Sequence, residues 1–190
     1  MRSVFAVAVL LLCAATVPVA SATLEEKLAP CLSCHGEKGQ SENVQTPSLG
    51  AQPSGYLLIQ IYMFREKMRK VDIMNDVTKG LTDDDLREFS DAITKLPAPV
   101  SVGDASDQAR ITHAQALIGE HRCNFCHAPD FAGQQQIPRL AAQREDYLLK
   151  ALREYKTGQR PGYDPAMTSV VEPLKDEDFV DLAYYLARVK

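Results

Sequence analysis

Residues 123–127 read Cys-Asn-Phe-Cys-His, and residues 31–35 read Cys-Leu-Ser-Cys-His. The two pentapeptides begin 92 residues apart, and each places a histidine directly after a pair of cysteines separated by two residues. Four chemistries use cysteines at this spacing: a disulfide, half of a zinc site, a thioredoxin-like redox pair, and covalent attachment of haem. The rest of the chain has to decide among them.

Further blocks of sequence repeat in the same order after each pentapeptide. TPSLGAQPSGYLL at 46–58 matches IPRLAAQREDYLL at 137–149, and LTDDDLREF at 81–89 matches LKDEDFVDL at 174–182. Ordered blocks whose spacing changes by only one or two residues are the signature of an internal repeat. The chain therefore contains two copies of one module.

The repeat predicts the domain organisation. We predict a first domain over 23–96, a linker over 97–109 and a second domain over 110–190, because the middle stretch is rich in Pro, Ser, Gly and Asp. Apolar residues recur with a helical period in both copies, for example over 55–68, and neither copy shows a sustained alternation typical of strands. We therefore predict an all-α fold of two tandem domains.

Two threonines mark expected helix starts. Thr23 precedes Glu26 by three residues, as in a capping box, and Thr82 precedes Asp85 in the same way.

The first 22 residues have the pattern of a secretory signal peptide. Arg2 is followed by an uncharged apolar stretch, and Ala20-Ser21-Ala22 gives a cleavage pattern after Ala22. We therefore expect an exported, periplasmic protein, and at most a peripheral association with the membrane, because no later stretch is apolar enough to cross a bilayer. With 21 Lys and Arg against 25 Asp and Glu, the chain has no basic field for binding nucleic acid.

Covalent haem attachment explains both pentapeptides best. A disulfide within one pair closes a loop too small to constrain much of the chain, and it leaves the histidine unexplained. A zinc site needs a second ligand pair at short spacing, and a thioredoxin-like pair is found beside a βαβ pattern; the chain has neither. In haem attachment, two thiols bond the porphyrin vinyl groups and the histidine ligates the iron. The predicted haem c residues are Cys31, Cys34, Cys123 and Cys126, with His35 and His127 as proximal ligands.

The repeat also selects the sixth ligand of each iron. Met167 is the only methionine in the second copy, 40 residues after His127, and Met74 lies 39 residues after His35. Each of these methionines precedes the shared leucine-led block by seven residues. We therefore predict His/Met ligation, which raises the reduction potential and leaves the iron without an open position.

Four other candidates for the sixth ligand are expected to serve elsewhere. Met63 and Met68 have no methionine counterpart in the second copy, and we expect them to fill space on a helix that packs against the haem or core. His113 and His121 precede the second motif in a polar stretch, and we expect them at the surface.

These motifs, in this order, resemble the cytochrome c4 family of dihaem c-type cytochromes. The resemblance covers essentially the whole mature chain and implies two class I cytochrome c domains with His/Met ligation of both irons. It also implies that the carbonyls of Pro47 and Pro138 accept hydrogen bonds from the proximal histidines. One departure is that the glycine after the motif is kept as Gly36 but replaced by Ala128.

The resemblance implies a carrier of single electrons and no catalytic residues. The expected partners are a periplasmic dehydrogenase or bc1-type complex as donor and a terminal oxidase or reductase as acceptor, and we expect a monomer with two unequal potentials. The alternative is the electron-accepting subunit of a small dihaem oxidoreductase, or such an enzyme itself, for instance a sulfur-compound dehydrogenase or a peroxidase. Basic residues before each methionine either steer a partner, pair with haem propionates or form a solvated face. They are Arg65, Lys67, Arg69, Lys70, Lys150, Arg153, Lys156 and Arg160.

Overall fold

The computed structural model describes residues 22–160 and 165–190, and the predicted signal peptide lies outside these residues except for Ala22. The described part is helical, which confirms the predicted fold class. Its helices are α1 (Leu24–His35), α2 (Ser54–Arg65), α3 (Asp72–Thr78), α4 (Asp83–Ile93), α5 (Gln108–Glu120), α6 (Cys123–Cys126), α7 (Glu145–Lys156), α8 (Ala166–Val171) and α9 (Asp176–Leu186). None of the helices described is long and apolar enough to span a membrane.

Two of these helices begin where the capping motifs predict. The Thr23 hydroxyl accepts a hydrogen bond from the Glu26 N–H at the start of α1, and the Glu26 carboxylate accepts from the Thr23 N–H in return. Thr82 and Asp85 form the same reciprocal pair at the start of α4. Each pair satisfies backbone donors that the first turn of a helix leaves without partners.

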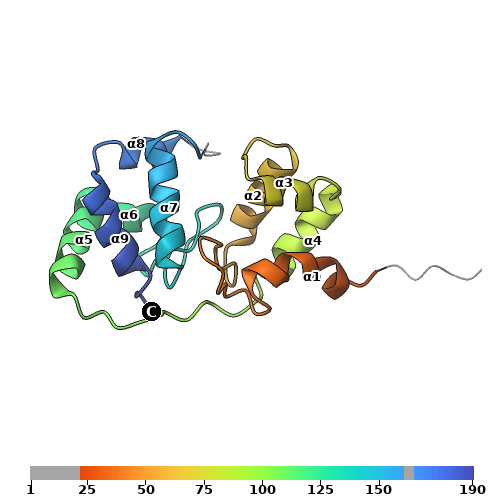
Figure 1. Cartoon of the computed structure of the whole chain (residues 1–190), viewed down its shortest axis with the longest axis horizontal. Helices are drawn as coiled ribbons and strands as arrows, with labels where there is room; N and C mark the ends of the chain where they lie inside the picture. Colours follow the sequence, from red (N-terminus) through yellow and green to blue (C-terminus); the bar gives the residue numbers. More distant parts are fainter. Residues whose placement is uncertain (1–21, 161–164) are drawn as a thin grey trace, which may run out of the picture.

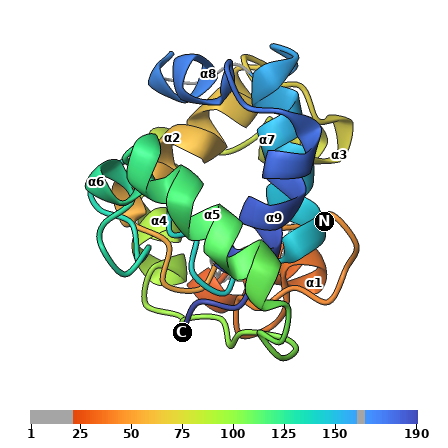
Figure 2. The same ribbon diagram turned by 90° about the vertical axis from the view of Figure 1, so that its left-hand side faces the viewer.

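The helices form two lobes that lie side by side, α1–α4 in one and α5–α9 in the other (Figure 1). In the second lobe α5 packs against α9, and α9 packs against α7 (Figure 2). The first lobe is organised around α2, which packs against α3 and α4. The fold is that of two tandem cytochrome c domains.

Each lobe has its own apolar core among the described residues. The core of the first is small and consists of Leu28, Leu57, Phe89 and Ile93. The core of the second is larger, and its buried members are Ala114, Leu117, Ile118, Phe131, Ala141, Leu148, Val171, Leu174, Phe179, Leu182, Ala183, Leu186 and Ala187. Domains of this size bury a modest share of their surface, so a group bound inside contributes a substantial part of the core.

The segment predicted as a linker is shorter than expected and is held at both ends. Helix α5 begins at Gln108, within the predicted range, because the Asp107 carboxylate caps the N–H of Arg110. On the side of the first domain, the Gln40 side-chain amide pairs with both the N–H and the carbonyl of Val100, each at 3.0 Å.

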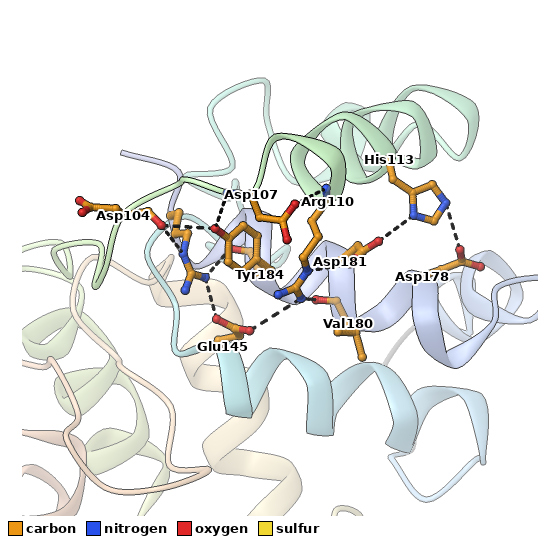
Figure 3. Close-up of polar contacts among 10 residues, drawn as sticks. Asp104, Asp107, Arg110, His113, Glu145, Asp178, Val180, Asp181 and Tyr184 are labelled. Atoms are coloured by element: carbon orange, nitrogen blue, oxygen red, sulfur yellow. Dashed lines mark hydrogen bonds and ion pairs between the residues drawn. The ribbon is translucent and has the colours of Figure 1, made fainter.

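On the side of the second domain, Tyr184 of α9 holds the linker (Figure 3). Its hydroxyl accepts from the Asp107 N–H at 3.1 Å and donates to the Asp104 carbonyl at 3.3 Å. The guanidinium carbons of Arg110 and Arg188 lie 4.1 and 3.7 Å from the centre of the Tyr184 ring. Cation–π contacts of this kind stabilise the position of the Tyr184 ring. The linker has a composition typical of flexible segments, yet it is held at both ends. We call its residues 97–107 the strap.

Candidate haem sites

The two CxxCH motifs lie on helices that reach them differently. In the first domain α1 runs without a break to its last residue, His35. In the second domain α5 ends at Glu120, Arg122 adopts a left-handed conformation with φ of 53°, and the short helix α6 carries the cysteines before His127. Both routes place two thiols and an imidazole at the end of a helix.

The thiols have the properties of attachment sites rather than of a redox pair. All four described cysteines are free, with Cys31 and Cys123 half-buried and Cys34 and Cys126 exposed. Burial raises the pKa of Cys31 and of Cys123, whereas a thioredoxin-like pair needs a lowered thiol pKa. Within residues 22–160 and 165–190, no three His, Cys, Asp or Glu side chains gather as a zinc site would require.

Both predicted proximal histidines are buried and oriented by a proline carbonyl. His35 Nδ1–H donates to the Pro47 carbonyl at 2.8 Å, and His127 Nδ1–H donates to the Pro138 carbonyl at 2.9 Å. Burial lowers the pKa of each imidazole, which keeps the ring neutral. With Nδ1 holding the proton, the lone pair of Nε2 is free to bind a metal.

A continuous cavity with a mostly apolar lining joins the two domains at these histidines. His35, Met74, His127 and Met167 all line it. The cavity is bounded further by apolar side chains of α2, α3, α4, α7 and the turn between α3 and α4, among them Leu57, Ile61, Phe64, Val77, Leu81, Phe89, Leu148 and Leu152. Apolar walls with a few polar groups are typical of cofactor sites.

The two methionines selected by the repeat sit on corresponding helices, Met74 on α3 and Met167 on α8. The other methionine candidates lie away from the cavity lining: Met63 is buried at 2% exposure, and Met68 is 53% exposed. The expectation that Met68 packs against haem or core is wrong, because α2 ends at Arg65 and Met68 follows it in a turn. His113 is exposed, and neither it nor His121 lines the cavity.

Two buried arginines face the same cavity, and within residues 22–160 and 165–190 neither has a carboxylate oxygen nearer than 4.0 Å. Arg160 donates to the Tyr147 hydroxyl at 3.0 Å and to the Tyr56 hydroxyl at 3.1 Å, and Arg69 donates to the Gln60 amide oxygen at 2.7 Å. Glu154 carries the acidic oxygen next to Arg160 among the described residues, at 4.0 Å. Buried cations need anionic partners, and haem brings two propionates. The residues present therefore fit haem.

The tyrosines of this cluster respond to the same charges. Burial raises the pKa of Tyr56, and the neighbouring Tyr147 raises it further. Burial would also raise the pKa of Tyr147, but the guanidiniums of Arg160 and Arg69 outweigh it and lower this pKa to about 7. The repeat places Tyr56 opposite Tyr147 and Arg69 opposite Arg160. The sequence alone gave the two tyrosines no predicted role, although this double correspondence was the signal that could have indicated one.

Of the other six basic residues, Lys150 also lines the cavity, where it pairs with Glu154, and Arg65 is half-buried. The exposed ones are Lys67, Lys70, Arg153 and Lys156. Arg65 pairs with Asp83 at 2.8 Å, and Arg153 pairs with Asp176 at 2.6 Å. Exposed pairs of this kind contribute little to stability. The basic residues before the methionines are thus divided into three that line the cavity, namely Arg69, Lys150 and Arg160, and five that do not.

Comparisons with known proteins agree with this geometry. The family model described as "Cytochrome c" matches residues 111–190. Cytochrome c4 of Pseudomonas aeruginosa is 27% identical over 170 residues, which cover 85% of this chain and 85% of the relative. The crystal structure of reduced recombinant cytochrome c4 from Pseudomonas stutzeri superimposes with a TM-score of 0.80 and 26% identity, covering 88% of this chain and 97% of that one. The chain belongs to the cytochrome c4 family.

As a member of the cytochrome c4 family the chain carries two covalent haem c groups and acts as a dihaem electron carrier with His/Met ligation. A longer solved protein also matches. Thiosulfate dehydrogenase TsdBA from Marichromatium purpuratum has a TM-score of 0.71 and 29% identity, covering 83% of this chain but 36% of that chain.

Proposed function

We propose that this member of the cytochrome c4 family is a periplasmic carrier of single electrons in which His35 and Met74 ligate one iron and His127 and Met167 ligate the other. The observation that carries the assignment is that all four side chains line one cavity, at matching positions of two sequence repeats. Bound haem would supply the one-electron chemistry, and methionine sulfur as a ligand would favour its reduced state.

The chain's own residues bind, orient and shield the cofactors. We propose domains over 23–96 and 110–190, each attaching its haem through one cysteine pair. The prolines fix the imidazole orientation, and the apolar walls exclude water from the iron. Arg69 and Arg160, which line the cavity, would offset the negative charge of haem propionates.

We further propose that the protein works as a monomer, exported by its signal peptide, and serves soluble or peripheral redox partners. A dehydrogenase or bc1-type complex would reduce it, and a terminal oxidase or reductase would oxidise it. The expectation of export rests on the N-terminal sequence pattern.

The first experiment is the absorption spectrum of the periplasmically matured protein, oxidised and reduced, with haem counted per chain. We expect two haems and the far-red band of methionine sulfur bound to ferric iron at full strength for two sites. Met74→Leu and Met167→Leu should each remove half of this band, whereas Met68→Leu, at an exposed position, should leave it unchanged.

A different result would redirect the assignment. A half-strength band in the parent protein, with one high-spin iron that binds carbon monoxide, would mean that one site is open, and an enzymatic role would then be favoured. Loss of the band in Met68→Leu would overturn the choice of Met74.

A second candidate function is that of an electron-accepting subunit held in a larger enzyme. The match to about a third of the longer thiosulfate dehydrogenase chain favours this reading. Co-purification of the tagged protein from its native periplasm distinguishes the two, because a subunit elutes with its partner at high salt and a free carrier elutes alone.

A further inference from the structure

The side chain of Gln143 in the second domain forms two hydrogen bonds with the backbone of Ser48 in the first domain. Its Oε1 accepts from the Ser48 N–H at 2.8 Å, and its Nε2 donates to the Ser48 carbonyl at 2.8 Å. Gln143 is 4% exposed and Ser48 1% exposed, so neither bond competes with bulk water. Hydrogen bonds shielded in this way are electrostatically stronger than those at a surface.

Gln52 of the first domain makes the same contact in the opposite direction. Its Oε1 accepts from the Arg139 N–H at 2.9 Å, and its Nε2 donates to the Arg139 carbonyl at 2.9 Å. Gln52 and Gln143 occupy the same position of the repeat, and so do Ser48 and Arg139. The domains are thus joined by two reciprocal amide–backbone pairs, which we call the glutamine clasp.

The clasp acts on the peptide groups that hold the proximal histidines. The N–H of Ser48 and the carbonyl of Pro47 belong to one peptide unit, and that carbonyl accepts the hydrogen bond from His35 Nδ1. In the second domain, the N–H of Arg139 and the carbonyl of Pro138 are likewise one unit, which accepts from His127. A peptide whose N–H donates becomes a stronger acceptor at its oxygen, because chained hydrogen bonds polarise one another.

We propose that each glutamine tunes the iron of the other domain: Gln143 acts on the haem ligated by His35, and Gln52 on the haem ligated by His127. A stronger bond from Nδ1–H to the proline carbonyl gives the imidazole more anionic character and makes it a more basic ligand. Such a ligand favours ferric iron, so each of the two glutamines of the clasp lowers the reduction potential of the haem in the other domain. Gln52 and Gln143 are positioning residues, and their role rests on the proposed ligation.

The size of the effect follows from the chain of bonds. Cooperativity strengthens each hydrogen bond of a chain by roughly 10–30%. The bond between the histidine and the proline carbonyl becomes stronger still as the imidazole takes on negative charge, because charged partners form stronger hydrogen bonds. We expect removal of one glutamine amide of the clasp to change the ferric-to-ferrous equilibrium of one haem by about two- to fourfold.

The test is a crossed pair of neutral substitutions, Gln143→Met and Gln52→Met. They keep the side-chain length and remove the amide. The potential of each haem is read from a redox titration followed by NMR, in which the haem methyl signals of the two domains are assigned separately. Gln143→Met should raise the potential of the haem bound at Cys31 and Cys34 and leave the other unmoved, and Gln52→Met should do the reverse.

The matched control is Gln40→Met, because Gln40 also pairs its amide with a backbone N–H and carbonyl, those of Val100, but touches no proximal peptide. It should leave both potentials unchanged. Thermal unfolding of all three variants reports the loss of stability separately from the potentials.

Three results would overturn the proposal. They are a shift of both potentials together, a shift confined to the haem of the substituted domain, or lowered stability with both potentials unmoved; the last would make the clasp purely structural. Failure of the ligand assignment is distinguishable, because it would appear in the parent protein as a missing methionine–iron band.

Discussion

The methionine helix of the first domain is held by polar contacts, whereas its counterpart in the second domain is held by apolar packing. In α3, the residue after Met74 is Asn75, which is buried, donates to the carbonyls of Phe64 and Arg69 at 2.6 and 2.9 Å, and accepts from the Val71 N–H at 2.9 Å. These bonds tie the whole turn after α2 to the helix that carries Met74.

The corresponding residues of α8 have different chemistry. Thr168 follows Met167 and lies exposed. The buried position four residues after the methionine is Val171, which belongs to the large apolar core, where the first domain has Thr78 bonded to the Met74 carbonyl. The two methionine helices are therefore held in place by different contacts, hydrogen bonds for α3 and apolar packing for α8. The sequence repeat predicts the methionine but not the contacts that position its helix.

Of the variants that test this comparison, Asn75→Ala is expected to change the free energy of unfolding most. It removes the side-chain partners of the Arg69 carbonyl and the Val71 N–H, while the Phe64 carbonyl keeps its bond from the Lys67 N–H. We expect these losses to destabilise the first domain by about 2–4 kcal/mol. Chemical unfolding followed at the methionine–iron band measures this. The matched variant Thr168→Ala should cost less than about 0.5 kcal/mol, since it lies at the surface. Equal losses in the two variants would contradict the comparison.

An exchange at the buried position sharpens the contrast. Val171→Thr places a hydroxyl in the apolar core of the second domain, and we expect a cost of about 1–2 kcal/mol. Thr78→Val removes the hydrogen bond to the Met74 carbonyl in the first domain, at a cost of about 1 kcal/mol. Urea unfolding of each variant provides both values, and a stabilising effect of either exchange would argue that the two supports are interchangeable.

A smaller effect is expected where the strap meets the second domain. Tyr184→Phe keeps the ring between Arg110 and Arg188 but removes the bonds to Asp104 and Asp107, so unfolding of the second domain should become easier by about 1 kcal/mol. Amide exchange should increase at Asp107 and not at Val100, which Gln40 holds from the first domain. Faster exchange at both residues would mean that the strap is released as a unit.

The smallest effect is the pH dependence contributed by His113 of α5. A hydrogen bond to Asp181 at 2.8 Å, with the charges of Asp178 and Asp181, raises the pKa of His113 (Figure 3). A raised folded-state pKa stabilises the protein below the unfolded-state value of about 6.5, and this contribution is lost as pH rises through the folded-state pKa. The melting temperature of His113→Gln should therefore fall below that of the parent at pH 5–6 and match it at pH 9. A constant difference at all pH values would contradict this.

The helices that carry the sites could be predicted in outline because their signals are local. The capping boxes at Thr23 and Thr82 and the apolar period of α2 all lie within a few residues of the structure they specify. The prediction for Met68 failed because the helical pattern over 55–68 continues past the point where the backbone turns, at Lys67 with φ of 55°. Asn75, eight residues after Lys67, holds that turn by hydrogen bonds to the Phe64 and Arg69 carbonyls, and the apolar pattern of 55–68 does not report these bonds.

The sequence by itself determined the cofactor and its number, because haem attachment is a local motif. The repeat, as an internal comparison, supplied the proposal of His35, His127, Met74 and Met167 as ligands. Only the tertiary structure brought Arg160 to Tyr56, split the basic stripe, anchored the linker and formed the glutamine clasp. The contacts of Arg160 with Tyr56, of the linker with Gln40 and Tyr184, and of the glutamine clasp join residues 60 to 104 positions apart. Spacing along the chain does not encode such pairs, since they depend on how two folded domains meet.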